Sequence, residues 1–97
     1  MEAFPNITAA IMNSSCTTLL EAKNPPTYSQ GLCMGIIYGV EDNATYDKKI
    51  CIPKAVDQTG RLTVVREYLL RNLSRSKEAY ASLVFDALYE KWPCKLK

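Results

Sequence analysis

The stretch GLCMGIIYGV, residues 31–40, decides the fold. Its glycines, Gly31, Gly35 and Gly39, recur every four residues and therefore share one face if the stretch is helical. The apolar run is too short for a membrane span, which needs about 20 residues. A glycine inside a helix costs about 1 kcal/mol relative to alanine. We therefore expect a neighbouring element to pack closely against this face, and the helix to fray near Asn43.

Residues on either side of this stretch indicate where helices begin and end. Apolar residues at helical spacing predict a first helix over residues 6–22, and the consecutive prolines of Asn24-Pro25-Pro26 end it. Thr27 begins the second helix, because Gln30 three residues later completes a capping box. Residues 42–49 are mostly polar and predict a loop.

The second half of the chain predicts further helices. Cys51-Ile52-Pro53 predicts an extended segment that interrupts the helices, since the residue before a proline avoids helical geometry. Asp57 or Thr59 caps a third helix, and Ser74 or Ser76 caps the last one. The fold class that follows is all-α: a compact bundle of four to five short helices, without a sheet, in one domain over residues 1–97.

Composition excludes several functional classes. The chain has 97 residues, 47% of them hydrophobic and 23% charged, which fits one globular domain. Its net charge of +2 is too small to predict binding to nucleic acid. Because it contains no histidine, triads and metal sites that depend on histidine are impossible.

Four cysteines, Cys16, Cys33, Cys51 and Cys94, permit two disulfides in any of three pairings. Helix spacing favours Cys16–Cys33 and Cys51–Cys94, which would staple two adjacent helices and close the hairpin of the last two. No CxxC pair supports a metal site, so we expect no metal. Disulfides indicate an oxidising compartment, and we expect that a starting methionine replaces a signal peptide.

Signals for an enzyme are weak. Asp86 and Glu90 lie one helical turn apart, but a solvated helix face explains them better than a catalytic carboxylate pair. The sequence has no P-loop, nucleophile elbow or zincin motif. We therefore expect no enzymatic activity and no cofactor. Four Asn-x-Ser/Thr sequons would suggest a glycosylated eukaryotic domain, but we treat them as incidental; they begin at Asn6, Asn13, Asn43 and Asn72.

A small stapled scaffold usually works by presenting a surface, and two segments are candidates. One is the polar turn of residues 72–77, and the other is the loop of residues 42–49. A rigid loop loses little entropy when it enters a cleft, which favours affinity. Either segment could also be an ordinary connector between helices.

A resemblance to a known family adds to this interpretation. The chain resembles the Rap/Tai immunity proteins, which protect bacteria against peptidoglycan amidases delivered by type VI secretion. The resemblance covers nearly the whole chain and rests on these residues in order: Cys16, GLCMGIIYGV with Cys33, Cys51-Ile52-Pro53, LTVVREYL (62–69), AYASLVFDAL (79–88) and Trp92-Pro93-Cys94. The chain departs from the family at Asn72-Leu73-Ser74-Arg75-Ser76, where a His-Pro-Glu stretch is usual.

The resemblance implies a periplasmic homodimer that inhibits an amidase related to the NlpC/P60 cysteine peptidases. Inhibition would occur by insertion of a protruding loop into the active-site cleft. The resemblance maps that loop onto Asn72, Leu73, Ser74, Arg75, Ser76 and Lys77, with Arg75 donating hydrogen bonds to the cleft. Arg66 and Glu67, on the third helix of the second subunit, would add contacts.

A periplasmic acid-stress chaperone is the main alternative, because such proteins are also small, helical and stapled by disulfides. A chaperone of this kind would release apolar surface at low pH. The absence of histidine removes the usual switch near pH 6, although carboxylates could act at lower pH.

Overall fold

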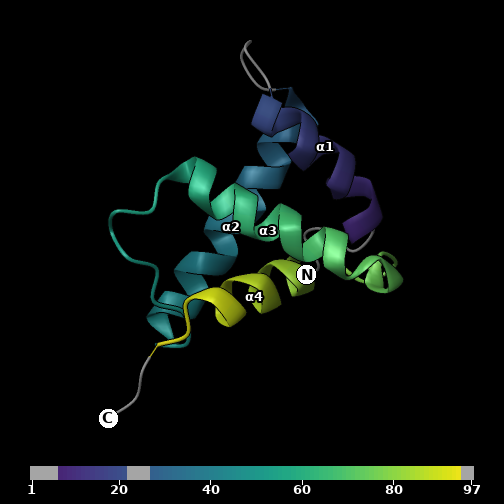
Figure 1. Cartoon of the computed structure of the whole chain (residues 1–97). Helices are drawn as coiled ribbons and strands as arrows, with labels where there is room; N and C mark the ends of the chain where they lie inside the picture. The colour runs from purple at the N-terminus through teal and green to yellow at the C-terminus, as the bar shows by residue number, and fades with distance from the viewer. Residues whose placement is uncertain (1–6, 22–26, 95–97) are drawn as a thin grey trace.

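The computed structural model describes residues 7–21 and 27–94. Within them the chain forms four α-helices and one short 3₁₀ turn (Figure 1). The elements are α1 (Ala9–Glu21), α2 (Tyr28–Tyr46), α3 (Gln58–Arg71), η1 (Leu73–Arg75) and α4 (Tyr80–Lys91). The described residues form no strand, so the predicted all-α bundle is confirmed.

One hydrophobic core lies between the four helices. Helices α1 and α4 each pack against both α2 and α3, whereas α2 and α3 pack less extensively against each other. Tyr80, at the start of α4, has the largest fully buried side chain. The other residues exposed by 2% or less are Met12, Cys16, Cys33, Ile37, Ile50, Leu62, Val65, Leu83, Val84, Ala87 and Leu88.

Both predicted disulfides are confirmed. Cys16–Cys33 joins α1 to α2 inside the core, where both cysteines are fully buried. Cys51–Cys94 joins the segment after α2 to the segment after α4. In the chain-entropy model, closing loops with sequence separations of 17 and 43 residues contributes about 3 and 4 kcal/mol.

Two of the predicted helix caps are present. The Oγ1 atom of Thr27 accepts from the backbone N–H of Gln30, and the Gln30 side chain accepts from the N–H of Thr27, so the capping box is complete. Asp57, and not Thr59, caps α3, because its Oδ1 atom accepts from the N–H of Gly60 at 2.8 Å. Local chemistry therefore sets the start of both helices.

Other boundaries were predicted wrongly. Helix α2 does not fray near Asn43 but continues to Tyr46, because Ala44 is buried and keeps the last turn against the core. The predicted loop of residues 42–49 is therefore reduced to a turn at residues 47–49.

The ends of α1 and α4 also differ from the prediction. Helix α4 begins at Tyr80 without a side-chain cap, because the N–H of Tyr80 donates to the carbonyl of Ile7 at 2.9 Å. Ser74 and Ser76 therefore cap no α-helix. Helix α1 begins at Ala9, and its predicted start at Asn6, its end at Ala22 and the stop at residues 24–26 lie outside the described residues.

Candidate partner-binding surfaces

The turn between α3 and α4 lies at the outer edge of the molecule, where α3 ends (Figure 1). It contains η1 and the whole predicted segment of residues 72–77. Leu73 is 58% exposed, and Ser74 and Lys77 are exposed beside it. An exposed leucine beside a hydroxyl and an ammonium group gives this turn a mixed apolar and polar tip.

Arg75 holds the base of this turn. Its guanidinium donates to both carboxylate oxygens of Glu78 at 3.0 and 2.8 Å, to Oδ2 of Asp86 at 2.8 Å and to the hydroxyl of Tyr68 at 2.8 Å. The hydrogen bonds to Glu78 and Asp86 raise the pKa of Arg75, and the bond from Arg75 lowers the pKa of Glu78. Arg75 therefore links α3, the turn and α4.

Backbone hydrogen bonds fix the same turn to the start of α1. The N–H of Ala10 donates to the carbonyl of Ser76, and the N–H of Ala9 donates to the carbonyl of Glu78, both at 2.9 Å. At the other end, the Asn72 side chain donates to the carbonyl of Tyr68 at 2.8 Å. Three elements thus constrain a short segment whose tip remains exposed.

Arg66 and Glu67 lie on α3, before the turn. The Nε atom of Arg66 donates to the hydroxyl of Thr17 on α1 at 2.9 Å, whereas Glu67 is exposed. Arg71, which the spacing would pair with Glu67, instead forms an ion pair with Glu90 of α4 at 3.0 Å. The hydrogen bond to Glu90 raises the pKa of Arg71.

The carboxylates considered for acid–base chemistry are therefore bound to arginines. Asp86 pairs with Arg75 and Glu90 pairs with Arg71, so each carboxylate has its own cationic partner. This pairing favours the interpretation of Asp86 and Glu90 as a charged helix face.

The second candidate segment, residues 42–49, presents a different surface. Lys48 has a left-handed backbone conformation, with φ at 61°. Lys48 and Lys49 border a hollow of about 360 Å³ together with Phe85, Tyr89 and Cys94, and the rings of Phe85 and Tyr89 are stacked. This surface is basic and aromatic, and it lies beside the Cys51–Cys94 disulfide.

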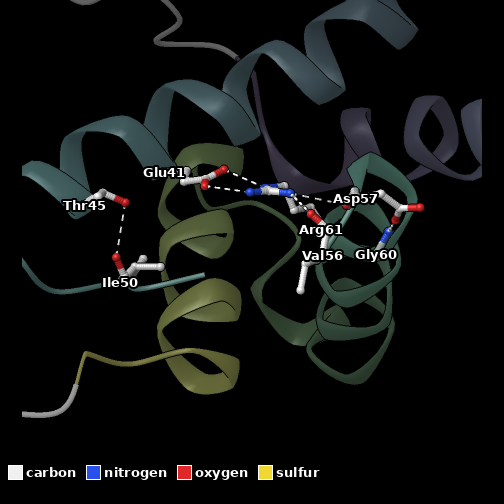
Figure 2. A network of polar contacts seen from close by, with 7 residues as sticks. All are labelled: Glu41, Thr45, Ile50, Val56, Asp57, Gly60 and Arg61. Atoms are coloured by element: carbon white, nitrogen blue, oxygen red, sulfur yellow. Dashed lines mark hydrogen bonds and ion pairs between the residues drawn. The ribbon is translucent and has the colours of Figure 1, made fainter. Parts of the chain in front are cut away.

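An ion pair fixes the long connection from α2 to α3 (Figure 2). Arg61 donates through Nε and Nη2 to the two carboxylate oxygens of Glu41, at 2.7 and 2.9 Å, and through Nη1 to the carbonyl of Val56. The hydrogen bond to Glu41 raises the pKa of Arg61. Since both charged side chains are only about 15% exposed or less, this pair is a structural anchor of the connection.

The glycine face of α2 contradicts the expected close packing. A methyl group placed on Gly31, Gly35 or Gly39 would meet no described atom within 4 Å, apart from its own helix backbone and chain neighbours. The face instead forms the floor of an open hollow of about 650 Å³. Its lining is Tyr28, Gly31, Leu32, Gly35, Ile36, Gly39, Val40, Asn43 and Ala81. The sequence identified the glycine pattern, but it could not show that no neighbour among the described residues covers this face.

The described part of the chain shows neither a metal-binding cluster nor a membrane-spanning helix. Its Cys, Asp and Glu side chains form no group of three or more that could hold a metal ion. None of its helices combines the length and apolarity needed to cross a bilayer.

The fold thus defines a small helical protein that is stapled by two disulfides and carries exposed segments fixed by hydrogen bonds and ion pairs. The chain matches the family of Rap1a immunity proteins over residues 8–94 and belongs to this family. Its members are immunity proteins associated with type VI secretion. No curated protein and no solved structure matches the chain.

Proposed function

We propose that this immunity protein binds a type VI peptidoglycan amidase and blocks it by inserting the turn of residues 72–77 into the active-site cleft. The Arg75 network carries this proposal, since it fixes the base of the turn while Leu73 and Ser74 remain exposed. A segment that is ordered before binding loses little conformational entropy in the complex. The exposed leucine supplies apolar contact area, and the serine hydroxyl can both donate and accept.

In this proposal Arg75 does not donate hydrogen bonds to the amidase, because its guanidinium is already engaged within the chain. Its Nε, Nη1 and Nη2 atoms already donate to Tyr68, Glu78 and Asp86. Breaking these bonds to reach a partner would remove what holds the turn. Arg75 is therefore a positioning residue, and contact with the amidase falls to Leu73, Ser74 and Lys77. Asn72 and Ser76 complete the turn.

The family resemblance supports the remaining parts of the proposal. The target is an NlpC/P60-like cysteine peptidase in the periplasm, a compartment in which the two disulfides would persist. The protein acts as a homodimer and not as an enzyme. In the dimer, Arg66 and Glu67 of the second subunit contact the amidase beside the inserted turn.

Titration of a type VI amidase encoded beside the gene tests this function. Release of cleaved stem peptide is followed as the protein is added, and we expect activity to end at a sharp stoichiometric point. Leu73→Asp places a charge on the tip without touching the Arg75 network, and we expect it to weaken inhibition at least tenfold. Full amidase activity at a large excess of the wild-type protein would contradict the proposal.

A matched variant separates the two candidate surfaces. Tyr46 is 87% exposed and lies in the segment 42–49, so Tyr46→Asp places the same charge at an exposed position on the other surface. We expect Tyr46→Asp to inhibit as well as the wild type. If Tyr46→Asp loses inhibition and Leu73→Asp retains it, the amidase binds the 42–49 segment and the turn is not the plug.

A further inference from the structure

The Cys51–Cys94 disulfide borders a hollow whose other walls are basic and aromatic. This hollow of about 360 Å³, called here the Lys48–Lys49 hollow, is lined by Lys48, Lys49, Phe85, Tyr89 and Cys94. Its volume falls within the usual range for small-ligand sites, about 300–1,000 Å³. It therefore provides room for a small molecule beside one end of a sulfur–sulfur bond.

The Cys51–Cys94 disulfide is also the more accessible of the two. Cys51 is exposed and Cys94 is partly exposed, whereas Cys16 and Cys33 are both fully buried. Exchange begins when a thiolate reaches one sulfur atom of a disulfide. A small thiol can therefore attack Cys51–Cys94 in the folded protein, and the buried pair supplies an unreactive comparison within the same molecule.

Two lysine side chains give this hollow a positive charge. No carboxylate of the described chain forms an ion pair with Lys48 or Lys49. Asp47, the acidic residue next to them in sequence, lines the neighbouring hollow and not this one. Cations at the edge of a hollow raise the local concentration of anions. An anionic thiol should therefore reach the disulfide more often than a neutral thiol of the same size.

Phe85 and Tyr89 give the hollow an apolar wall. They lie one helical turn apart on α4, and their rings are nearly parallel, with centroids 5.8 Å apart. Tyr89 is 49% exposed, so part of this wall is open to solvent. An aliphatic chain can pack against such a surface. The lysines and the rings together fit a short aliphatic thiol with an acidic group at its other end.

Backbone hydrogen bonds hold the two cysteines together independently of the disulfide. The N–H of Cys51 donates to the carbonyl of Trp92 at 2.9 Å, and the N–H of Cys94 donates to the carbonyl of Lys49 at 3.1 Å. Two thiols held side by side readily re-form their disulfide, because the reaction is intramolecular. Modification at this position should therefore be reversible.

We propose that Cys94 is a site of reversible thiolation by small anionic thiols, which the Lys48–Lys49 hollow recognises through their acidic group. The sulfur of the incoming thiolate forms a bond to Sγ of Cys94. The Cys51–Cys94 bond breaks, and its electron pair leaves on Sγ of Cys51 as a thiolate. One thiolate and one disulfide thus yield one mixed disulfide and one thiolate, without an oxidant. Attack by Cys51 on the mixed disulfide reverses the reaction and expels the small thiol.

Exchange rates with two probe thiols of similar size test the proposal. The anionic probe is 2-mercaptoethanesulfonate, and the uncharged probe is 2-mercaptoethanol. Each is mixed with the oxidised protein at low ionic strength, and N-ethylmaleimide blocks free thiols at intervals. Mass spectrometry then counts the chains that carry one probe and one maleimide. At equal thiolate concentration we expect the sulfonate to react about fourfold faster, and peptide mapping should place the probe on Cys94 and the maleimide on Cys51.

Lysine substitutions separate recognition of the acidic group from general reactivity of the disulfide. Lys49→Gln should lower the ratio of the sulfonate rate to the mercaptoethanol rate about twofold, and the double variant Lys48→Gln/Lys49→Gln should abolish the preference. The ratio cancels any change in how readily the disulfide opens. Lys77→Gln removes one exposed positive charge from the turn between α3 and α4 and should keep the wild-type ratio.

The outcomes that would overturn the proposal are equally specific. Equal rates with the two probes in the wild type, or an unchanged ratio in the double variant, would mean that the lysines do not recognise the acidic group. A probe found on Cys51 in place of Cys94 would mean that attack does not occur from the hollow. The experiment requires no amidase, and none of the lining residues belongs to the turn of residues 72–77, so its result is independent of the proposed inhibition.

Discussion

The hydroxyl of Tyr80 donates a hydrogen bond to the carbonyl oxygen of Cys33, 3.1 Å away in the centre of the core. The same hydroxyl lies 3.2 and 3.3 Å from the sulfur atoms of Cys16 and Cys33. Burial raises the pKa of Tyr80, so the hydroxyl stays protonated and available as a donor. One side chain thus connects the start of α4 to the disulfide between α1 and α2.

Removing this hydroxyl should destabilise the protein without preventing folding. We expect Tyr80→Phe to lower the free energy of unfolding by about 1 kcal/mol, the usual net value of one hydrogen bond. Urea denaturation at neutral pH measures the change. Tyr46→Phe removes a hydroxyl from a ring that is 87% exposed and should leave the midpoint unchanged. Equal urea midpoints for Tyr80→Phe and the wild type would mean that the hydrogen bond from Tyr80 to Cys33 contributes nothing to the free energy of unfolding.

The two disulfides should differ in their accessibility to reductant. Cys16 and Cys33 are fully buried, whereas Cys51 is exposed and Cys94 is partly exposed. A thiolate must reach a sulfur atom to begin exchange. Brief treatment of the folded protein with dithiothreitol and iodoacetamide should therefore alkylate two cysteines first. Peptide mapping should locate both alkyl groups at Cys51 and Cys94.

Complete reduction supplies the control for this experiment. In urea all four cysteines should react, because unfolding exposes the Cys16–Cys33 pair. If Cys16 and Cys33 were alkylated first in the folded protein, the core around Tyr80 would have to open more readily than the segments after α2 and α4 that Cys51–Cys94 joins.

Lowering the pH should destabilise the turn of residues 72–77, because it protonates Glu78. Arg75 lowers the pKa of Glu78 below its ordinary value of 4.5. A carboxylate whose pKa is lower in the folded state stabilises the fold above the unfolded-state pKa, and this stabilisation is lost as pH falls through the folded-state pKa. The wild type should therefore melt above Glu78→Gln at pH 5.5 to 7, and the difference should shrink below about pH 4.5.

Thermal melts of both proteins over this pH range measure the effect. Asp42 is exposed and forms no ion pair within the described chain, so Asp42→Asn is a matched loss of one carboxylate. We expect this variant to change the melting temperature less than Glu78→Gln does at pH 5.5 to 7, because it removes no ion pair. A Glu78→Gln difference that grows on acidification would contradict the assigned role of Arg75.

Sequence patterns predicted the parts of the fold that depend on local chemistry. The capping box at Thr27, the Asp57 cap and the helical class each follow from neighbouring residues. The start of α4 did not follow, because its first N–H bonds to Ile7, more than 70 positions earlier in the chain. The extension of α2 to Tyr46 likewise depends on burial of Ala44 by tertiary packing.

The candidate surfaces also combine features that neighbouring residues determine with features that only tertiary packing determines. The sequence selected the turn of residues 72–77, but Arg75 was expected to be free for a partner. Its bonds to Tyr68 and Asp86 join residues that only the folded chain brings together. The glycine spacing on α2 led to a wrong prediction, because no described neighbour packs against that face. Whether another helix of the same chain fills such a face depends on the global packing, which periodicity does not determine.

The left-handed backbone conformation of Lys48 should lower the stability of the protein. Lys48 adopts φ 61° directly after Asp47, the C-cap of α2, a position at which glycine is usual because side chains disfavour this conformation. Lys48→Gly should therefore raise the free energy of unfolding by up to about 1 kcal/mol, measured by urea denaturation. Lys49 has no positive φ, so Lys49→Gly removes the same charge and should instead lower the stability by a similar amount, since glycine makes the unfolded chain more flexible. Opposite signs at two adjacent lysines would establish that backbone strain, and not the loss of charge, causes the change. Shifts in the same direction would show that strain at Lys48 is negligible.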